Sequence, residues 1–159
     1  MSEANGVFKM INAESKQVVV DTLSIADSFA SRFVGLQFRR ELPVGHGLLL
    51  MPCRSIHTCW MRFAIDVIFL DADGTVLDIR SAVRPWRTAA SRHGRPHATL
   101  EVAAGCSMLS IGDRVQVIGK PGRGNSPASK ASTSPFQPID IQPASEFQFD
   151  SLKVEANSC

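Results

Sequence analysis

The 159-residue sequence contains no apolar run close to the roughly 18 to 20 residues that a transmembrane helix needs. We therefore expect no membrane span. Neither charge sign dominates, because 17 basic side chains stand against 15 acidic ones and leave a net charge of +2. This balance argues against a strongly basic nucleic-acid-binding protein, and against an acidic disordered chain, as descriptions of the whole sequence.

Cysteine is scarce, and its spacing does not indicate a disulfide framework. Cys53, Cys59, Cys106 and Cys159 form no Cys-x-x-Cys pair. A secretory signal has a basic stretch followed by an apolar segment. The sequence that starts with residues 1–6 does not show this pattern. Because free thiols are typical of a reducing compartment, we expect a cytoplasmic protein.

Metal and nucleotide motifs are also missing. His57 and Cys59 alternate onto one face of a predicted strand, with Cys53 just upstream, and two ligands on one face can begin a metal site. No Cys-x-x-Cys or His-x-x-x-His supplies further ligands, and no Gly-rich phosphate loop, dinucleotide fingerprint or serine nucleophile elbow occurs. We expect neither a metal nor another cofactor.

Composition divides the chain into two parts. Residues 120–143 contain five of the nine prolines and are rich in serine and glycine, so they cannot bury enough apolar surface to offset the entropy of ordering. We expect a single strand-rich domain over residues 6–119 and a flexible tail over residues 120–159. Residues 146–154 either dock on the domain as a strand or stay mobile. We expect a monomer.

Short strands dominate the predicted domain. The one clear helix covers Asp27 to Arg39, with Asp27 as its N-cap and Phe29, Phe33 and Leu36 facing inward. A helical turn is expected over residues 105–111. β-Branched and apolar runs predict strands over residues 7–11, 17–23, 47–51, 56–62, 64–70, 75–80, 97–104 and 112–118. The predicted fold class is α+β: a compact, mostly antiparallel, small β-barrel-like domain with one N-terminal helix and a disordered C-terminal tail.

An ordered series of motifs resembles the domain of unknown function 192 family, also called uncharacterised protein family 0127. The motifs lie between about Arg32 and Val117, and the resemblance implies a compact, strand-rich fold and no established activity. The family commonly reads Trp-Met-x-Asn-Thr, whereas this chain lacks the Asn-Thr pair after Trp60-Met61. The matching motifs are Arg32 to Arg39, Leu42, Gly47, Trp60-Met61, Ile65 to Phe69, Asp71-x-Asp73-Gly74, Val83-x-Pro85, Glu101-Val102-x-x-Gly105 and Ile111 to Val115.

Two carboxylates are weak catalytic candidates. Asp66 lies in a strand whose two faces are both apolar, so it is expected to be partly buried, and a buried charge demands a partner. Asp66 is then either an acid or base in a pocket, or a structural carboxylate bound to backbone amides or to Arg32 or Arg39. The structural interpretation is favoured. Glu101 shares its strand face with Thr99 and Ala103, so we expect it to be solvated or at a rim.

The segment from Arg80 to His97 is locally basic. It contains five arginines and two histidines but no acid, and Trp86 lies among them. Such a loop either is simply solvated or contacts a phosphate, an anionic sugar or RNA, with Trp86 stacking on a base or sugar. One basic loop without a nucleic-acid-binding fold is a weak signal, so the solvated interpretation is slightly favoured.

These observations favour a small binding or accessory module over an enzyme. The module would contact an anionic small molecule or RNA. One alternative is a hydrolase-like enzyme that uses Asp66 with Glu101 or His57, and another is an interaction protein tethered through its tail. The predicted contact surface, beside a pocket containing Trp60 and Asp66, comprises Arg84, Trp86, Arg87, Arg92 and Arg95.

Overall fold

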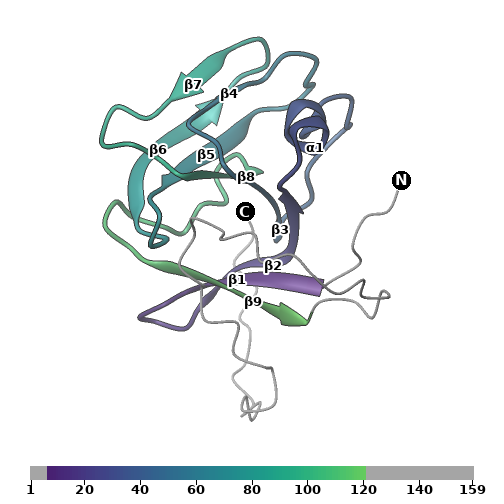
Figure 1. The fold of residues 1–159 in the computed structure, drawn as a ribbon. Coiled ribbons are helices and arrows are strands. Elements are labelled where there is room, and N and C mark those ends of the chain that lie inside the picture. Colours follow the sequence, from purple (N-terminus) through teal and green to yellow (C-terminus); the bar gives the residue numbers. More distant parts are fainter. Residues whose placement is uncertain (1–6, 121–159) are drawn as a thin grey trace, which may run out of the picture.

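A computed structural model describes residues 7–120, in which strands dominate (Figure 1). The predicted tail lies outside these residues, apart from Lys120. No helix of the described part is long and apolar enough to cross a membrane. The elements are β1 (Val7–Asn12), β2 (Val18–Ala26), α1 (Phe29–Val34), β3 (His46–Leu50), β4 (Ser55–His57), β5 (Ile65–Leu70), β6 (Val76–Val83), β7 (Thr88–Ala90), β8 (Ala98–Ala103) and β9 (Val115–Lys120).

Seven strands form one mixed sheet in the order β6-β5-β8-β3-β2-β1-β9, and β4 pairs with β7 in a separate two-stranded sheet. Only β2 and β3 run parallel within the large sheet. The large sheet curls, and Thr75 and Arg114, which precede the two edge strands, form an isolated bridge. Because β9 then continues along β1 rather than β6, the sheet is not closed into a barrel, and the predicted barrel-like closure is not confirmed.

The middle strands are apolar because both faces of the sheet are covered. All six residues of β5 are buried, and so are five of the six in β8. Two cores result. The first contains Met10, Val20, Leu23, Leu49, Ile68, Leu70, Val76, Ala98, Leu100, Val102, Leu109, Val115 and Val117. The second contains Ala26, Leu36, Leu42, Leu48, Leu50, Ile56, Met61, Ile65, Val67, Phe69 and Ala89.

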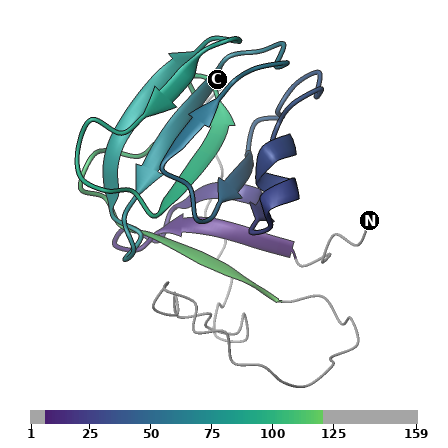
Figure 2. The ribbon, with the colours of Figure 1, turned by 45° about the horizontal axis from the view of Figure 1, so that its top comes forward.

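The small β4–β7 sheet lies over β5 and β6 in both ribbon views (Figure 2). One side chain from each of its strands, Ile56 and Ala89, is buried in the second core beside Val67 and Phe69. The remaining residues of both strands are exposed. The small sheet therefore covers the second core and leaves its outer face, together with the loops at its end, accessible to a ligand.

The helix differs from its prediction. It spans Phe29–Val34, with Ser28 rather than Asp27 as N-cap, because the Ser28 and Ser31 side chains bond each other's backbone N–H groups. Gly35, at φ 47°, ends the helix after six residues. So short a helix has no long apolar face to bury, and Phe29 and Phe33 are 79% and 61% exposed, against the prediction. Leu36, beyond the helix end, is buried as predicted.

The strand predicted over residues 56–62 is confirmed only at its start, as β4. β4 ends at His57. The bond from the Thr58 N–H to the Arg87 carbonyl continues the β4–β7 register for one more residue, and the chain then turns at Trp60, where φ is 65°. The alternation that placed His57 and Cys59 on one strand face is therefore lost. The short strand β7 was not predicted, and residues 105–111 form turns and irregular structure rather than a helical turn.

Candidate functional site

Thr58 joins two loops at the end of the small sheet. It is fully buried, and its hydroxyl donates to the Arg84 carbonyl at 2.7 Å and accepts from the Arg87 N–H at 2.9 Å. Its backbone N–H donates to the Arg87 carbonyl at 2.8 Å, and its carbonyl accepts from the Trp86 N–H at 3.0 Å. These bonds fix the loop of residues 84–87 against the loop that carries Trp60.

These two loops and the loop after α1 bring together an exposed aromatic cluster, which we define as Phe38, Trp60 and Trp86. The ring centroids of Phe38 and Trp60 are 6.1 Å apart and nearly stacked, and those of Trp60 and Trp86 are 4.9 Å apart and edge-to-face. Phe38 also donates its N–H to the Trp60 carbonyl. The three side chains are 69%, 56% and 55% exposed, which is unusual for large aromatic residues in mutual contact.

All three members of the aromatic cluster have left-handed backbones. Their φ angles are 63° for Phe38, 65° for Trp60 and 61° for Trp86. A bulky residue rarely adopts this conformation, and each instance costs on the order of 1 to 3 kcal/mol. The hydrogen bonds of Thr58 and Trp60 therefore hold these side chains in positions that the local backbone disfavours.

A surface cavity of about 530 Å³, wide open to solvent, lies between β6 and β7, beside the loop that carries Trp86. Arg80, Arg84, Arg87 and Arg92 line it, and we call it the arginine cavity. Arg84, Arg87 and Arg92 are exposed, whereas Arg80 is half-buried. Within residues 7–120, no carboxylate forms an ion pair with Arg84 or Arg87. Ser81 and Thr88 add hydroxyl groups to the lining.

Asp78 anchors the other two arginines. It is buried, and its carboxylate lies 3.4 Å from Arg80 Nε and 3.7 Å from Arg92 Nε. It also accepts the Arg92 backbone N–H at 2.8 Å. Burial opposes ionisation of Asp78, but this backbone bond and the two guanidinium charges outweigh it and lower its pKa. Asp78 therefore stays ionised and orients Arg80 and Arg92 at the cavity.

Asp66 is enclosed by backbone rather than open to a ligand. It is buried, and its two oxygens accept the Ala82 N–H at 2.8 Å and the Gly105 N–H at 3.0 Å. The register between β5 and β6 shifts between Ile65 and Val67, so Asp66 supports an irregularity at Ala82, where φ is 51°. Ala82 lines the arginine cavity. Asp66 thus shapes the strand beside the cavity, which agrees with the structural interpretation of this residue.

Glu101 was expected to be solvated or at a rim, and this expectation is wrong. It is 3% exposed on β8, opposite Leu48 and Val67, because this face of β8 is covered by the second core. Its Oε2 atom has no hydrogen-bond partner among the described residues. Burial raises the pKa of Glu101 to about 8. Asp66 and Glu101 lie on adjacent strands, but neither residue lines the arginine cavity.

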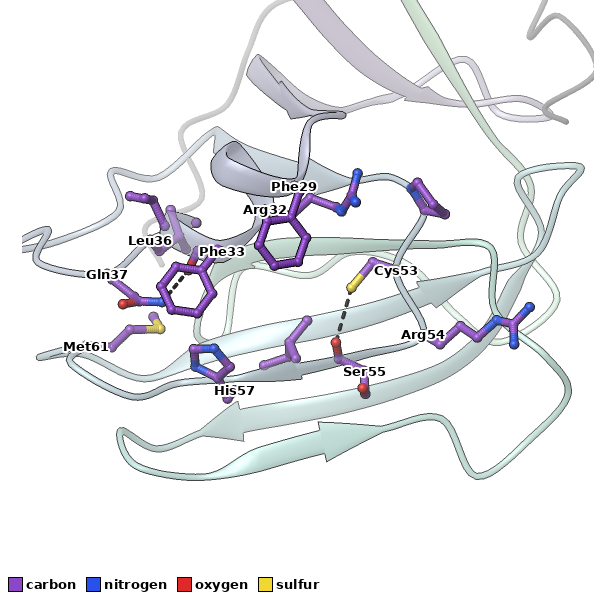
Figure 3. A pocket seen from close by; sticks show the side chains of 14 residues that line it. Phe29, Arg32, Phe33, Leu36, Gln37, Cys53, Arg54, Ser55, His57 and Met61 are labelled. Carbon is purple, nitrogen blue, oxygen red and sulfur yellow. Dashed lines mark hydrogen bonds between the residues drawn. The ribbon is translucent and has the colours of Figure 1, made fainter. Parts of the chain in front are cut away.

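The second cavity, of about 300 Å³, lies between α1 and β4 (Figure 3). Phe29 and Phe33 from the helix lie over it, and Phe33 makes an edge contact with His57 at 6.2 Å. Cys53 also lines it and donates to the Ser55 carbonyl. Burial raises the pKa of the Cys53 thiol, which makes it a poor nucleophile near neutral pH. Cys59 does not line this cavity with His57.

The structure brings together most of the predicted contact residues, but around two centres. Arg84, Arg87 and Arg92 line the arginine cavity, whereas Arg95 does not. Trp86 and Trp60 belong to the aromatic cluster, and neither of the two cavities is lined by Trp60 and Asp66 as predicted. Phe38 was missed because it was placed in a helix. Its position before Arg39-Arg40 offered the only sequence signal.

The fold and these features define a small, mostly β domain built on one large curled mixed sheet. The family profile of DUF192, described as "Uncharacterized ACR", matches residues 10–117. The chain belongs to this family, which confirms the resemblance found in the sequence motifs.

Relatives and solved structures agree with this assignment. A UPF0127 protein of Pyrococcus abyssi is 33% identical over 115 residues, which cover 66% of this chain and 94% of the relative. A UPF0127 protein of Pyrococcus furiosus is 37% identical over 81 residues, which cover 49% and 69%. A crystal structure of a candidate transcription regulator from Sinorhizobium meliloti matches 75% of this chain and 96% of its own, with 26% identity and a TM-score of 0.62.

A second solved structure extends the likeness in fold. It is a protein of unknown function from Novosphingobium aromaticivorans, 22% identical, with a TM-score of 0.59 over 69% of this chain and 82% of that protein. Together, these similarities place the chain in an uncharacterised family and support the fold, while the family itself carries no established activity.

Proposed function

We propose that this protein is a binding module that takes an anionic ligand of the phosphate class in the arginine cavity. The observation that carries the proposal is the convergence of four arginines on one cavity of about 530 Å³. One guanidinium group can donate two parallel hydrogen bonds to two oxygens of a phosphate. This recognition is best when the position of the guanidinium group is fixed before the ligand binds. The cytoplasmic location belongs to the proposal, since Cys53 and Cys59 are free thiols.

The charges at the cavity support an anion rather than a neutral ligand. Asp78 offsets part of the charge of Arg80 and Arg92, but Arg84 and Arg87 have no ion-pair partner among residues 7–120. Backbone bonds to Thr58 hold the chain at Arg84 and Arg87, so little backbone entropy is lost when a ligand binds. A ligand that carries at least two negative charges would neutralise the unpaired positive charges of Arg84 and Arg87.

The hydrolase-like alternative finds less support. It requires Asp66 to reach a substrate, whereas both carboxylate oxygens bond backbone N–H groups in the interior. Its proposed partner Glu101 is equally buried. The tethering alternative concerns residues outside the described part of the chain, so the binding module is the function we pursue.

The test is a titration of the full chain with inorganic pyrophosphate, followed by calorimetry and by thermal unfolding. We expect saturable binding and a rise in Tm with ligand concentration, because a ligand that binds the native state stabilises it. The double variant Arg84→Gln/Arg87→Gln should lose about tenfold or more in affinity, since it removes two charge-assisted donors.

Arg114→Gln is the matched control, because Arg114 is exposed and lies beside the start of β6, at the other end of the strand from the cavity. It should bind pyrophosphate as the wild type does. The double variant removes two charges and Arg114→Gln removes one. If the loss of binding free energy per removed charge is the same in both, binding follows net charge alone, and the arginine cavity is not the site.

A further inference from the structure

We propose that the aromatic cluster of Phe38, Trp60 and Trp86 is a base-stacking platform, and that the ligand class of this protein is single-stranded nucleic acid. This inference rests on the proposed anion-binding function, because the phosphates would lie on the arginines beside the cluster. It adds a second recognition element that the arginine cavity alone does not supply.

The first argument is the exposure of the rings. Apolar aromatic side chains that touch one another normally lie in a core, yet these three are each more than half exposed. Their left-handed backbones are held by hydrogen bonds from the Trp86 N–H to the Thr58 carbonyl and from the Phe38 N–H to the Trp60 carbonyl. Strain that persists because surrounding bonds enforce it is characteristic of functional positions. The fold therefore keeps the three aromatic rings exposed to solvent.

The second argument is the charge beside each ring. Phe38 is followed directly by Arg39, Trp60 by Met61 and then Arg62, and Trp86 by Arg87. The three arginines are exposed, and no carboxylate of residues 7–120 forms an ion pair with them. One acidic residue lies near these arginines in the sequence. It is Glu41, three positions after Phe38, and it is also exposed.

Aromatic rings in contact with one another, with an arginine close to each in the sequence, match the chemistry of a nucleotide chain. Successive bases stack on aromatic side chains while basic groups follow the backbone phosphates. A neutral sugar would use the rings but would have no need of the arginines. An inorganic anion would use the arginines but not the rings. Only a ligand that carries both flat apolar faces and negative charges would contact both the aromatic rings and the arginines.

A single strand fits better than a duplex. The bases of a duplex are stacked on one another, so their faces are not free to contact a protein ring. The chain also has a net charge of only +2, which is low for a protein that relies on the dense phosphate charge of a double helix. The cluster is therefore suited to unstacked bases.

The chain contains its own reporter for this inference. It has two tryptophans and no tyrosine, and both tryptophans belong to the aromatic cluster. Stacking of a base on either indole should quench the intrinsic fluorescence. The experiment titrates the full chain with an oligothymidylate of about eight nucleotides, within the usual site size of such proteins. An abasic oligomer with the same number of phosphates, and the corresponding duplex, are titrated in parallel.

We expect quenching by oligothymidylate and at least tenfold weaker binding of the abasic oligomer and the duplex. In anisotropy measurements with a labelled oligonucleotide, Phe38→Leu and Trp86→Leu should each weaken binding about tenfold, which is the usual effect of losing one stacking partner. Phe29→Leu is the matched control, since Phe29 is 79% exposed on α1 and lies outside the cluster, and it should bind as the wild type does. Unchanged Tm values show that the variants fold.

The outcomes separate this inference from the proposed function. Equal binding of the abasic oligomer and oligothymidylate, without quenching, would overturn base stacking and leave anion binding intact. Failure of both oligomers together with failure of pyrophosphate would overturn both proposals. Unchanged affinity in Phe38→Leu and Trp86→Leu would also overturn the inference, even if oligothymidylate binds.

Discussion

At the scale of single residues, two buried carboxylates on adjacent strands have opposite environments. Asp66 accepts two backbone N–H bonds, whereas Oε2 of Glu101 has no partner among the described residues. The sequence indicated that Asp66 is buried, because its strand is apolar on both faces. It did not indicate burial of Glu101, because the residues on the same strand face, Thr99 and Ala103, are small or polar. What covers this face is the second core, which comes from distant parts of the chain.

The burial of Glu101 predicts how the stability of the protein depends on pH. Its pKa is raised from the usual value near 4.5 to about 8, so between these pH values the native state binds more protons than the unfolded state. The free energy of unfolding should therefore fall as pH rises from about 4.5 to 8. Glu101→Gln removes this dependence and should stabilise the protein by up to about 3 kcal/mol at pH 7.

Urea denaturation of the wild type and Glu101→Gln at several pH values between 5 and 8 measures this effect. Glu41→Gln is the control, because Glu41 is exposed and its loss should leave the slope unchanged. If the wild type and Glu101→Gln show parallel dependence on pH, the carboxyl of Glu101 is not held protonated by its surroundings.

At the scale of elements, the decisive structures are the loops at the end of the small sheet. Apolar alternation predicted most strands of the large sheet, since their pattern is set by burial. It failed after His57 because the chain turns at Trp60, where φ is 65°, and Thr58 instead bonds the loop of residues 84–87, which is some 29 positions away. It failed at α1 because Gly35 ends the helix early. Both outcomes depend on contacts or backbone angles that no local pattern contains.

Thr58→Val tests the role of these bonds. The substitution keeps the volume but leaves the Arg87 N–H without its hydroxyl acceptor, which should cost about 1 to 3 kcal/mol of stability. Only the backbone bonds of residue 58 would then hold the loop that carries Trp86. Because this loop would be held less firmly beside Trp60, the circular-dichroism signal of the two coupled indoles should weaken. Affinity for pyrophosphate should fall with it.

Thr99→Val is the matched control, since Thr99 is equally buried and its hydroxyl bonds the Cys53 carbonyl away from the aromatic cluster. It should lose stability while keeping the indole signal. Loss of that signal in both variants, or in neither, would contradict the role assigned to Thr58.

At the scale of the whole molecule, the curled sheet gathers residues that the sequence keeps apart. Arg84, Arg87 and Arg92 come from one segment, and the sequence predicted them as a contact surface. Phe38 and Trp60 reach Trp86 only through the arrangement of three separate loops. The strand-rich fold and the basic segment were therefore predictable, whereas the cavity, the burial of Asp78 and the aromatic cluster required the three-dimensional structure.

The most direct test of the central claim is an NMR titration of the full chain with pyrophosphate, which follows the Nε–Hε signals of the arginine side chains. The account predicts saturating shifts for Arg84, Arg87 and Arg92, which line the cavity, and none for Arg114 at the far end of β6. Shifts of similar size at every arginine, or none at the three cavity residues, would contradict it.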